Sequence, residues 1–570
     1  MTKEKSVLVI FKKELPKKNQ KWFQQFDKII GPNELEEFID SGSVKEAYEF
    51  AIKLSHLTLL DGSRLVKSVN YKGYELWWID YQNLYHHFCL PYTKYRRLLE
   101  YLKDFDKIHL YQPSYPELFS YFFKAHKRQC VIFNPFSLRK LLPIPFGIFL
   151  QLTLSVLFVP WLVVKNPKVM VFTGDKFDLP YDYDFRMKFI YEELRKKKIY
   201  FVEFIRSLES WSVVLNHALK RKRPVIYSAA IVDLMRFFTR IFMKNQEKEL
   251  VNLFLSSRIN TEEYFRFLIA IHYLRNIKGD IWSIRVMKFI LQRIGVKVAI
   301  FSAACERNFR TILGCKLNKI PTVGILHGAP SKHYPVYDFM PGFDGKKMLS
   351  VDKYGIWSNY WKEYYIKNSK AYKTEQLYIS GLMRPLIEQV VYKNSEIKKG
   401  SIKVLFISEQ LAVPSEVMPY LLALMEVKDF DLYLKFRPYR DGFELWLKKH
   451  RPEILKKVKI LRGSMAKAVP QSDVVVGSHS TAVLESLLYL KPFIFFWTNK
   501  WGDYYEIKSF NQSNLFAENP KELIDCIRNS IYTSKKELKK LQNRFFGNPY
   551  QNGSKWVVEQ ALKYLEPKTF

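Results

Sequence analysis

Short runs of apolar residues, separated by segments with helical spacing, recur along the chain. Segments such as Phe185–Lys197 and Asn308–Leu317 are long enough for the helices between these runs. Continuous apolar runs that alternate with helices are typical of strands in a parallel sheet covered on both faces. The pattern therefore predicts an α/β fold, with strands at Val7–Phe11, Lys107–Tyr111, Cys130–Phe133, Val169–Phe172, Ile199–Phe204, Val298–Ser302 and Thr322–Leu326.

A second series of apolar runs begins near Lys353. Between the two series, the sequence Pro-Gly-Phe-Asp-Gly at 341–345 would break any regular element. We therefore expect two Rossmann-like domains that face a cleft, where open parallel sheets bind their ligands. The second series predicts strands at Tyr354–Trp357, Leu377–Ser380, Lys403–Ser408, Asp431–Phe436, Val458–Leu461, Asp473–Val476 and Phe493–Trp497.

Two further stretches complete the predicted division of the chain. The aromatic and basic stretch from about 206 to 293 has helical spacing, which indicates a helical insertion. The segment from Leu141 to Val164 contains no charged residue. We therefore divide the chain into an N-terminal α/β region (1–140), an apolar segment (141–165), a Rossmann-like domain (166–345) with its insertion, and a second Rossmann-like domain (346–570).

The apolar segment is long enough to cross a bilayer, and basic residues flank it. Three prolines interrupt it, however, and leave only Phe146–Val159 without a break. A single crossing would also place two parts of one α/β architecture in different compartments. We therefore expect a monotopic or re-entrant contact with anionic lipid, and a buried core helix is the alternative.

The composition indicates what kind of molecule the protein binds. The net charge is +35, with 91 Lys and Arg against 56 Asp and Glu, which favours an acidic partner. Nucleic acid is not expected, because the sequence contains no zinc-ligand spacing and no RNA-binding aromatic signature. The five cysteines form no CxxC pair, and the N-terminus lacks the apolar core of a signal peptide. We expect a cytoplasmic protein at the inner face of the cell membrane.

The strongest candidate for ligand binding follows the predicted strand Asp473–Val476. Ser478, Ser480 and Thr481 lie where a loop turns into a helix, so their hydroxyls and the first helical amides could bind a phosphate. The alternative is that Ser480 or Thr481 only caps the helix. Glu485, one turn further on, could accept hydrogen bonds from a ribose.

Three other predicted strands end in polar residues. Arg437 and Arg440 could bind a diphosphate or carboxylate, and Glu409 could contact a base or a ribose. His327, followed by a glycine, could donate to a phosphate or exchange protons near neutral pH. Solvated basic turns, polar strand ends and a structural histidine remain the alternatives.

The order of these segments resembles a known family. Thr322–Gly328 is similar to a strand that ends in His-Gly, Lys435–Pro438 to a Lys-x-His-Pro element, and Asp473–Pro492 to a Ser-x-Ser-Thr helix followed by Gly-x-Pro. Together they resemble GT-B glycosyltransferases of bacterial capsule and surface polysaccharide synthesis, including the Kdo and sialic acid transferases, and the related CDP-glycerol glycerophosphotransferases. The chain departs from this pattern at Arg437, which replaces a histidine, and at Leu490, which replaces a glycine.

The resemblance implies a metal-independent, inverting sugar transfer from a nucleotide-sugar donor, with no cofactor, to a surface glycan or a lipid-linked acceptor. An inverting transfer needs a base for the acceptor hydroxyl, and Asp175 and Glu306, each following a predicted strand, are the candidates beside His327. The alternatives are a transferase of alditol phosphate from a CDP-linked donor and a non-catalytic, membrane-associated scaffold.

Overall fold

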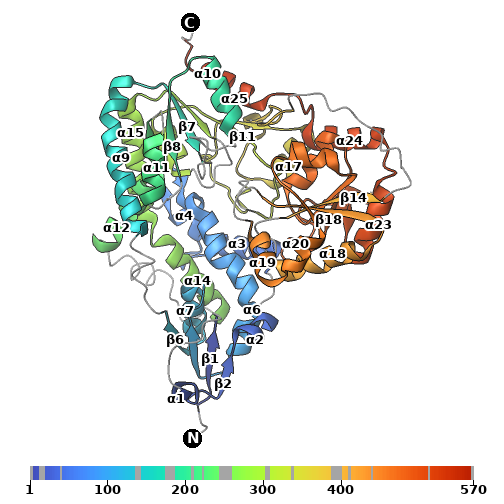
Figure 1. Cartoon of the computed structure of the whole chain (residues 1–570). Helices are drawn as coiled ribbons and strands as arrows, with labels where there is room; N and C mark the ends of the chain where they lie inside the picture. Colours follow the sequence, from blue (N-terminus) through green and yellow to red (C-terminus); the bar gives the residue numbers. More distant parts are fainter. Residues whose placement is uncertain are drawn as a thin grey trace.

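The fold is seen in a computed structural model of the chain (Figure 1). It describes residues 4–11, 20–38, 42–134, 143–173, 187–206, 211–220, 224–242, 260–301, 309–334, 339–386, 401–408, 413–437, 441–510 and 514–566. Within these residues, three parallel sheets of four, seven and six strands form the framework, with helices packed around them. The predicted α/β class with two Rossmann-like sheets is confirmed.

The smallest sheet belongs to the N-terminal region and has the order β2-β1-β5-β6. The expected strands at Val7–Phe11, Lys107–Tyr111 and Cys130–Phe133 are confirmed to within one residue. The strands are β1 (Ser6–Ile10), β2 (Lys28–Ile30), β5 (Lys107–Tyr111) and β6 (Gln129–Phe133). The helices of this region are α1 (Gln20–Phe23), α2 (Pro32–Phe38), α3 (Val44–Ser55), α4 (Leu65–Ser68), α5 (Tyr81–Leu84), α6 (Leu90–Leu102) and α7 (Pro116–Ala125).

The central sheet has seven strands in the order β13-β12-β11-β10-β7-β8-β9. They are β7 (Val169–Thr173), β8 (Phe201–Ile205), β9 (Val225–Tyr227), β10 (Val298–Phe301), β11 (Thr322–Ile325), β12 (Lys353–Ile356) and β13 (Leu377–Ile379). The helices are α9 (Pro143–Lys165), α10 (Lys188–Lys196), α11 (Trp211–Lys220), α12 (Ser228–Phe242), α14 (Thr261–Leu274), α15 (Ile277–Ile294), α16 (Phe309–Leu317) and α17 (Asn359–Asn368).

The third sheet has six strands in the order β16-β15-β14-β17-β18-β19. They are β14 (Ile402–Ile407), β15 (Phe430–Lys435), β16 (Lys459–Leu461), β17 (Val474–Gly477), β18 (Phe493–Phe496) and β19 (Phe516–Ala517). The helices are α18 (Pro414–Glu426), α19 (Gly442–His450), α20 (Pro452–Lys457), α21 (Met465–Ala468), α22 (Thr481–Leu484), α23 (Pro520–Ser530) and α24 (Lys535–Phe546).

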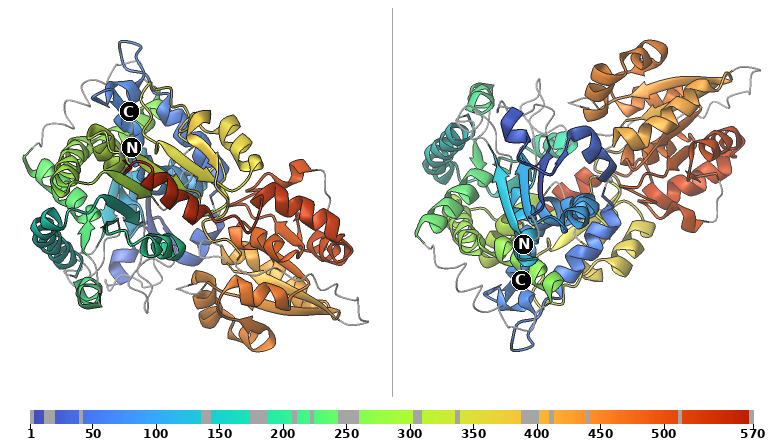
Figure 2. Two further views of the ribbon diagram at one scale, coloured as in Figure 1. Left: turned by 90° about the horizontal axis from the view of Figure 1, so that it is seen from above. Right: turned by 90° about the horizontal axis from the view of Figure 1, so that it is seen from below.

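The last helix, α25 (Gly553–Leu562), leaves the third sheet and packs on β10 and β11 of the central one. Figure 2 shows this helix, in dark red, beside the central sheet and apart from the rest of the C-terminal domain. The Gly553 amide donates to the Leu382 carbonyl at 2.8 Å and fixes the crossing. The end of the chain therefore ties the second large domain to the first.

The boundary between the large domains differs from the prediction. β12 and β13, expected to begin the second sheet, pair within the central sheet, so the sheets change between β13 and β14 and not near residue 345. The Asp352 carboxylate explains the placement of β12, because it accepts hydrogen bonds from the Thr322 amide (2.9 Å) and hydroxyl (2.8 Å) at the start of β11. The expected helical insertion at 206–293 also contains a strand, β9.

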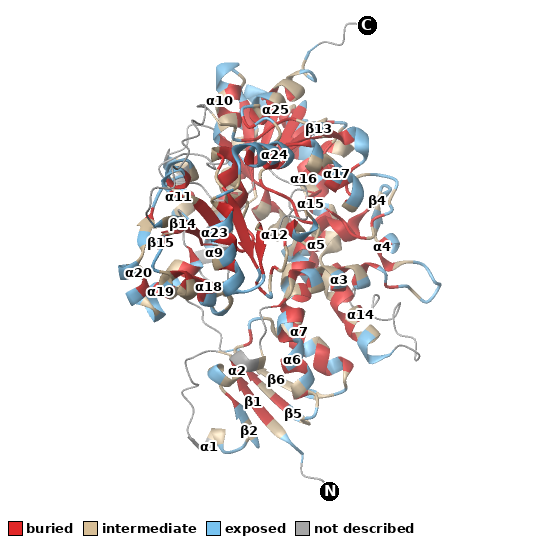
Figure 3. Cartoon of the chain, turned by 90° about the vertical axis from the view of Figure 1, so that its right-hand side faces the viewer, coloured by how far each residue is buried: buried red, intermediate tan, exposed pale blue. Residues whose placement is uncertain are grey.

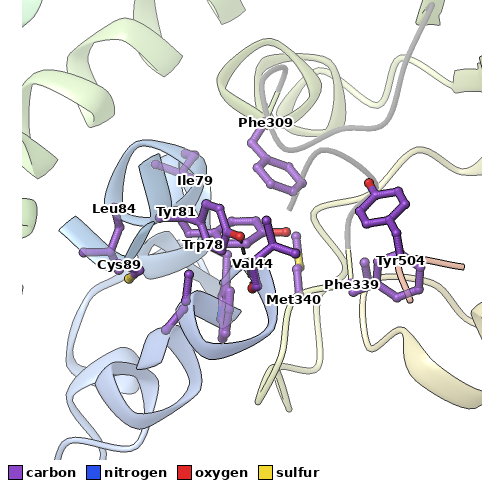
Figure 4. Close-up of a cluster of buried hydrophobic side chains, with 14 of the residues drawn as sticks. Val44, Trp78, Ile79, Tyr81, Leu84, Cys89, Phe309, Phe339, Met340 and Tyr504 are labelled. Atoms are coloured by element: carbon purple, nitrogen blue, oxygen red, sulfur yellow. Dashed lines mark hydrogen bonds between the residues drawn. The ribbon is translucent and has the colours of Figure 1, made fainter. Parts of the chain in front are cut away.

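Burial follows the predicted layers (Figure 3). Every residue of β7, β10, β17 and β18 is buried, as expected for strands covered on both faces. One hydrophobic cluster joins all three parts, since it contains Trp78 of the N-terminal region, Phe309 and Met340 of the central domain, and Tyr504 of the third (Figure 4). A shared core of this kind fixes the sheets relative to one another.

Candidate functional site

The carboxyl ends of the two large sheets meet in the middle of the molecule. The loop after β11 contains His327, which is half-buried, Gly328 and Ala329, while the loop after β17 runs from Ser478 to Thr481. The Ala329 amide donates to the Thr481 hydroxyl oxygen at 3.1 Å, a hydrogen bond between the two domains. Ligands of open parallel sheets bind at this edge, so the two domains present their functional edges to each other.

The hydroxyls of Ser480 and Thr481 also contact protein atoms. Ser480 caps α22, because its side-chain oxygen accepts a hydrogen bond from the Ala482 amide at 3.1 Å. The Thr481 hydroxyl lies 3.4 Å from the hydroxyl of Tyr505 and accepts from Ala329 as well. Ser480 therefore acts as the N-cap of α22, as the capping alternative predicted. The helix that it caps is short, with four residues.

Ser478 forms a pair with a histidine that the sequence analysis left without a role. The Ser478 hydroxyl lies 2.8 Å from Nδ1 of His479, and both side chains are buried. The His479 ring stacks on Trp501, with ring centroids 3.8 Å apart. Burial, with Lys500 and Arg437 nearby, lowers the pKa of the His479 imidazole well below its usual value. The imidazole is therefore neutral at pH 7.

Arg437 is exposed at the carboxyl end of β15. The loop that carries it is held by Asp441, whose carboxylate accepts from the Arg437 amide at 3.0 Å and from the Ser408 hydroxyl at 2.8 Å. Asp441 also caps α19 through the amides of Phe443 and Glu444. The ends of β14 and β15 are thereby fixed together, with a permanent cation beside the Ser478–His479 loop.

Lys500 is a second cation at this place, and it follows β18. Its ammonium lies 5.3 Å from the ring centroid of Trp501. Desolvation and the charge of Lys94 outweigh the attraction of Glu416 and lower the pKa of Lys500 to about 8. The sequence analysis chose polar residues that follow predicted strands, and it missed Lys500. The same criterion could have found it, because Lys500 follows β18.

Glu485 faces another part of the protein. Its carboxylate lies 3.4 Å from a guanidinium nitrogen of Arg384, in the segment after β13. The predicted role of Glu485 toward a ribose therefore competes with an ion pair between the domains.

Four predicted site residues, Asp175, Glu306, Glu409 and Arg440, lie outside the described residues. The strands before Asp175 and Glu306 are β7 and β10, which are neighbours of each other in the central sheet, and β10 also pairs with β11. Because these strands are parallel, their carboxyl ends share the edge that carries His327. Among the described residues, no group of three His, Cys, Asp or Glu side chains is arranged to hold a metal ion.

No protein-family model matches this chain, and no curated protein matches its sequence. Similar solved structures include a UDP-N-acetylglucosamine 2-epimerase, with 13% identity over 71% of this chain and 97% of the other and a TM-score of 0.40. A glycosyltransferase from Rickettsia africae has 12% identity over 70% and 99% (TM-score 0.39), and the calicheamicin glycosyltransferase CalG4 has 9% over 71% and 99% (TM-score 0.43). Likeness at this level is too distant to transfer an activity, so the function has to be argued from the chain's own residues.

Proposed function

We propose that this protein is a glycosyltransferase that moves a sugar from a nucleotide-activated donor to a glycan, with a surface or lipid-linked glycan as the acceptor. The observation that supports the proposal is the meeting of two parallel-sheet edges through Ala329 and Thr481. Arg437 and Lys500 are both close enough to His479, at this meeting point, for their charges to lower its pKa. Two cations beside the carboxyl ends of strands suit the phosphates of a nucleotide.

In the proposed reaction, an acceptor hydroxyl attacks the anomeric carbon of the donor sugar. The bond between that carbon and the phosphate oxygen breaks, and the nucleotide leaves with the electron pair. Arg437 and Lys500 stabilise the charge that develops on the phosphate, while the two domains hold donor and acceptor in line. A base on the central-sheet side, for which Asp175 and Glu306 are the candidates, takes the proton of the acceptor.

The neutral His479 has a supporting part in this scheme. Its ring is held flat against Trp501 and its Nδ1 contacts the Ser478 hydroxyl. An imidazolium there would be a buried positive charge close to two other cations, Lys500 and the exposed Arg437, and both the burial and the like charges disfavour it. His479 therefore orients Ser478, and the negative charge of the phosphate is balanced by the two cations alone.

The first test measures nucleotide binding. The full chain is heated with CMP, CDP, UDP or GDP, and the nucleotide of the donor should raise the unfolding temperature. Arg437→Ala and Lys500→Ala should each weaken binding by about 1.5–3 kcal/mol, the contribution of a hydrogen bond to a charged group. The matched control is Lys521→Ala, an exposed lysine on α23 of the same domain, which should bind as the wild type does.

The second test identifies the product. A glycosidic bond in the product supports the proposal, whereas a phosphodiester would show an alditol-phosphate transferase. The variants Asp175→Asn and Glu306→Gln separate catalysis from binding, because loss of the base should abolish transfer and leave nucleotide binding unchanged. If no nucleotide stabilises the chain, and both variants keep its cellular role, the protein is a scaffold and the proposal fails.

A further inference from the structure

The long apolar helix α9 is oriented with its small and polar residues inward. Gly147, Gln151, Ser155 and Leu162 recur on one side of the helix, and all are buried. The Ser155 hydroxyl accepts a hydrogen bond from the Tyr227 amide of β9 at 2.9 Å. The side of α9 that faces the protein therefore carries Gln151 and Ser155 together with partly buried apolar residues such as Ile148, Leu152 and Leu154.

The opposite side of α9 carries large apolar side chains in contact with solvent. Phe146, Phe149, Val156, Leu157 and Val164 follow one another at helical spacing and are 59–82% exposed. The 20 residues Phe146–Lys165 are long and apolar enough to cross a membrane by length and composition, yet most of this stretch is not buried against the protein. A stripe of this length is about 30 Å long, far more than the scattered apolar residues of an ordinary surface.

The neighbouring helix α11 extends the apolar surface. It packs against α9 on the outer side of the central domain (Figure 1). Its residues Trp211, Leu215 and Leu219 are exposed and lie four residues apart, on one side of the helix. The rings of Phe146 and Trp211 contact each other edge to face, with centroids 6.3 Å apart. The exposed sides of the two helices therefore form one continuous surface, the α9/α11 face.

Basic residues gather at the carboxyl end of this face. Lys165 and Lys168 are exposed where α9 ends. Trp161 of α9 contacts Tyr200 edge to face, with centroids 6.3 Å apart, and Tyr200 follows the exposed basic run 195–198. Aromatic side chains next to lysines are typical of the boundary between lipid tails and anionic headgroups.

We propose that the α9/α11 face docks on an anionic lipid bilayer and that α9 lies in the plane of the membrane without crossing it. The basic residues at the carboxyl end of the face would bind anionic headgroups, and the exposed apolar residues of α9 would enter the upper part of the acyl chains. The inner side of α9 is occupied by β9, α12 and α15, so a crossing would carry the edge of the central sheet into the bilayer. The proposal is independent of the sugar transfer, since docking requires no donor.

The test uses the full chain and preformed vesicles. The wild type should sediment with vesicles that contain phosphatidylglycerol, bind less to pure phosphatidylcholine, and be released as salt is raised. The double variant Leu157→Asp/Val164→Asp should bind at least about tenfold more weakly, because it places two charges in the stripe. The control is Leu60→Asp, another highly exposed leucine, which lies in the N-terminal region and should leave binding unchanged.

Three outcomes would overturn the inference. One is that the wild type binds neither kind of vesicle. Another is a wild-type dimer that the double variant converts to monomers without any lipid binding, which would show that a second copy of the chain covers the face. The third concerns the sides of the membrane on which the two ends of the chain lie. With a tag at each end, both tags should be accessible from the same side of the cell membrane, and tags on opposite sides would show that α9 crosses it.

Discussion

Replacing Asp280 with asparagine should strongly destabilise the protein, because Asp280 neutralises two buried guanidiniums. Its carboxylate, 3% exposed, accepts from Nε of Arg236 at 2.9 Å and from Nε of Arg310 at 2.8 Å. Arg310 also pairs with Asp80 at 3.1 Å, and Arg236 contacts Asp80 at 2.5 Å. The four side chains therefore form a charge-balanced cluster that joins the N-terminal region to α12, α15 and α16.

The expected magnitude follows from the burial of the cluster. Asparagine would leave two guanidiniums with Asp80 as their ion-pair partner and Asp233 nearby. Removing one partner of a buried ion pair costs about 3–5 kcal/mol. Because one hydrophobic core joins all three parts, the unfolding entropy is that of the 570-residue chain, and the loss lowers the unfolding temperature by about 3–4 °C. Circular dichroism during heating measures the drop, with Asp344→Asn as the control. Asp344 pairs with Arg64 and Lys67 at the surface, so its loss should cost less than about 1 kcal/mol.

A charge-balanced variant and the pH dependence complete this test. Asp280→Leu/Arg310→Met leaves Arg236 paired with Asp80 and should be more stable than Asp280→Asn. Burial raises the pKa of Asp80, but Arg310 and Arg236 outweigh it and lower the pKa below its usual value. The stabilisation is therefore complete above about pH 4 and is lost as the pH falls through the lowered pKa. Equal unfolding temperatures for Asp280→Asn and Asp344→Asn would refute the reasoning.

Three further predictions concern the site and its support. Because the pKa of Lys500 is lowered to about 8, nucleotide affinity should fall as the pH rises from 7 to 9, and Lys500→Arg should remove this dependence in a titration. Ser480→Ala removes the cap of α22 and should lower the free energy of unfolding by about 1 kcal/mol, as measured in urea; no change would show that the cap contributes nothing. Gly381→Ala should lower the free energy of unfolding by more than about 1 kcal/mol in the same assay, because φ of Gly381 is +81° and an added Cβ would lie 2.4 Å from the Gln551 carbonyl oxygen. A variant as stable as the wild type would contradict this steric argument.

The sequence predicted local structure well and the site in part. Strands such as Val298–Phe301 and Phe493–Phe496 are found where the apolar runs are, because burial on both faces requires apolar residues at every position. The strand β9 was missed, because it lies within the stretch 206–293, whose helical spacing predicted only helices. Thr481 does lie at the contact between the two sheets, and the capping by Ser480 was one of two alternatives that the sequence left open.

The sequence by itself determined the order of strands and helices and the apolar character of α9, because these depend on neighbours within a few residues. The tertiary structure alone decided that β12 and β13 pair in the central sheet, that Lys500 and Arg437 lie beside His479, and which side of α9 faces solvent. Those outcomes depend on contacts between segments tens to hundreds of residues apart. Periodicity along the chain records that a side is buried, and it does not record which partner buries it.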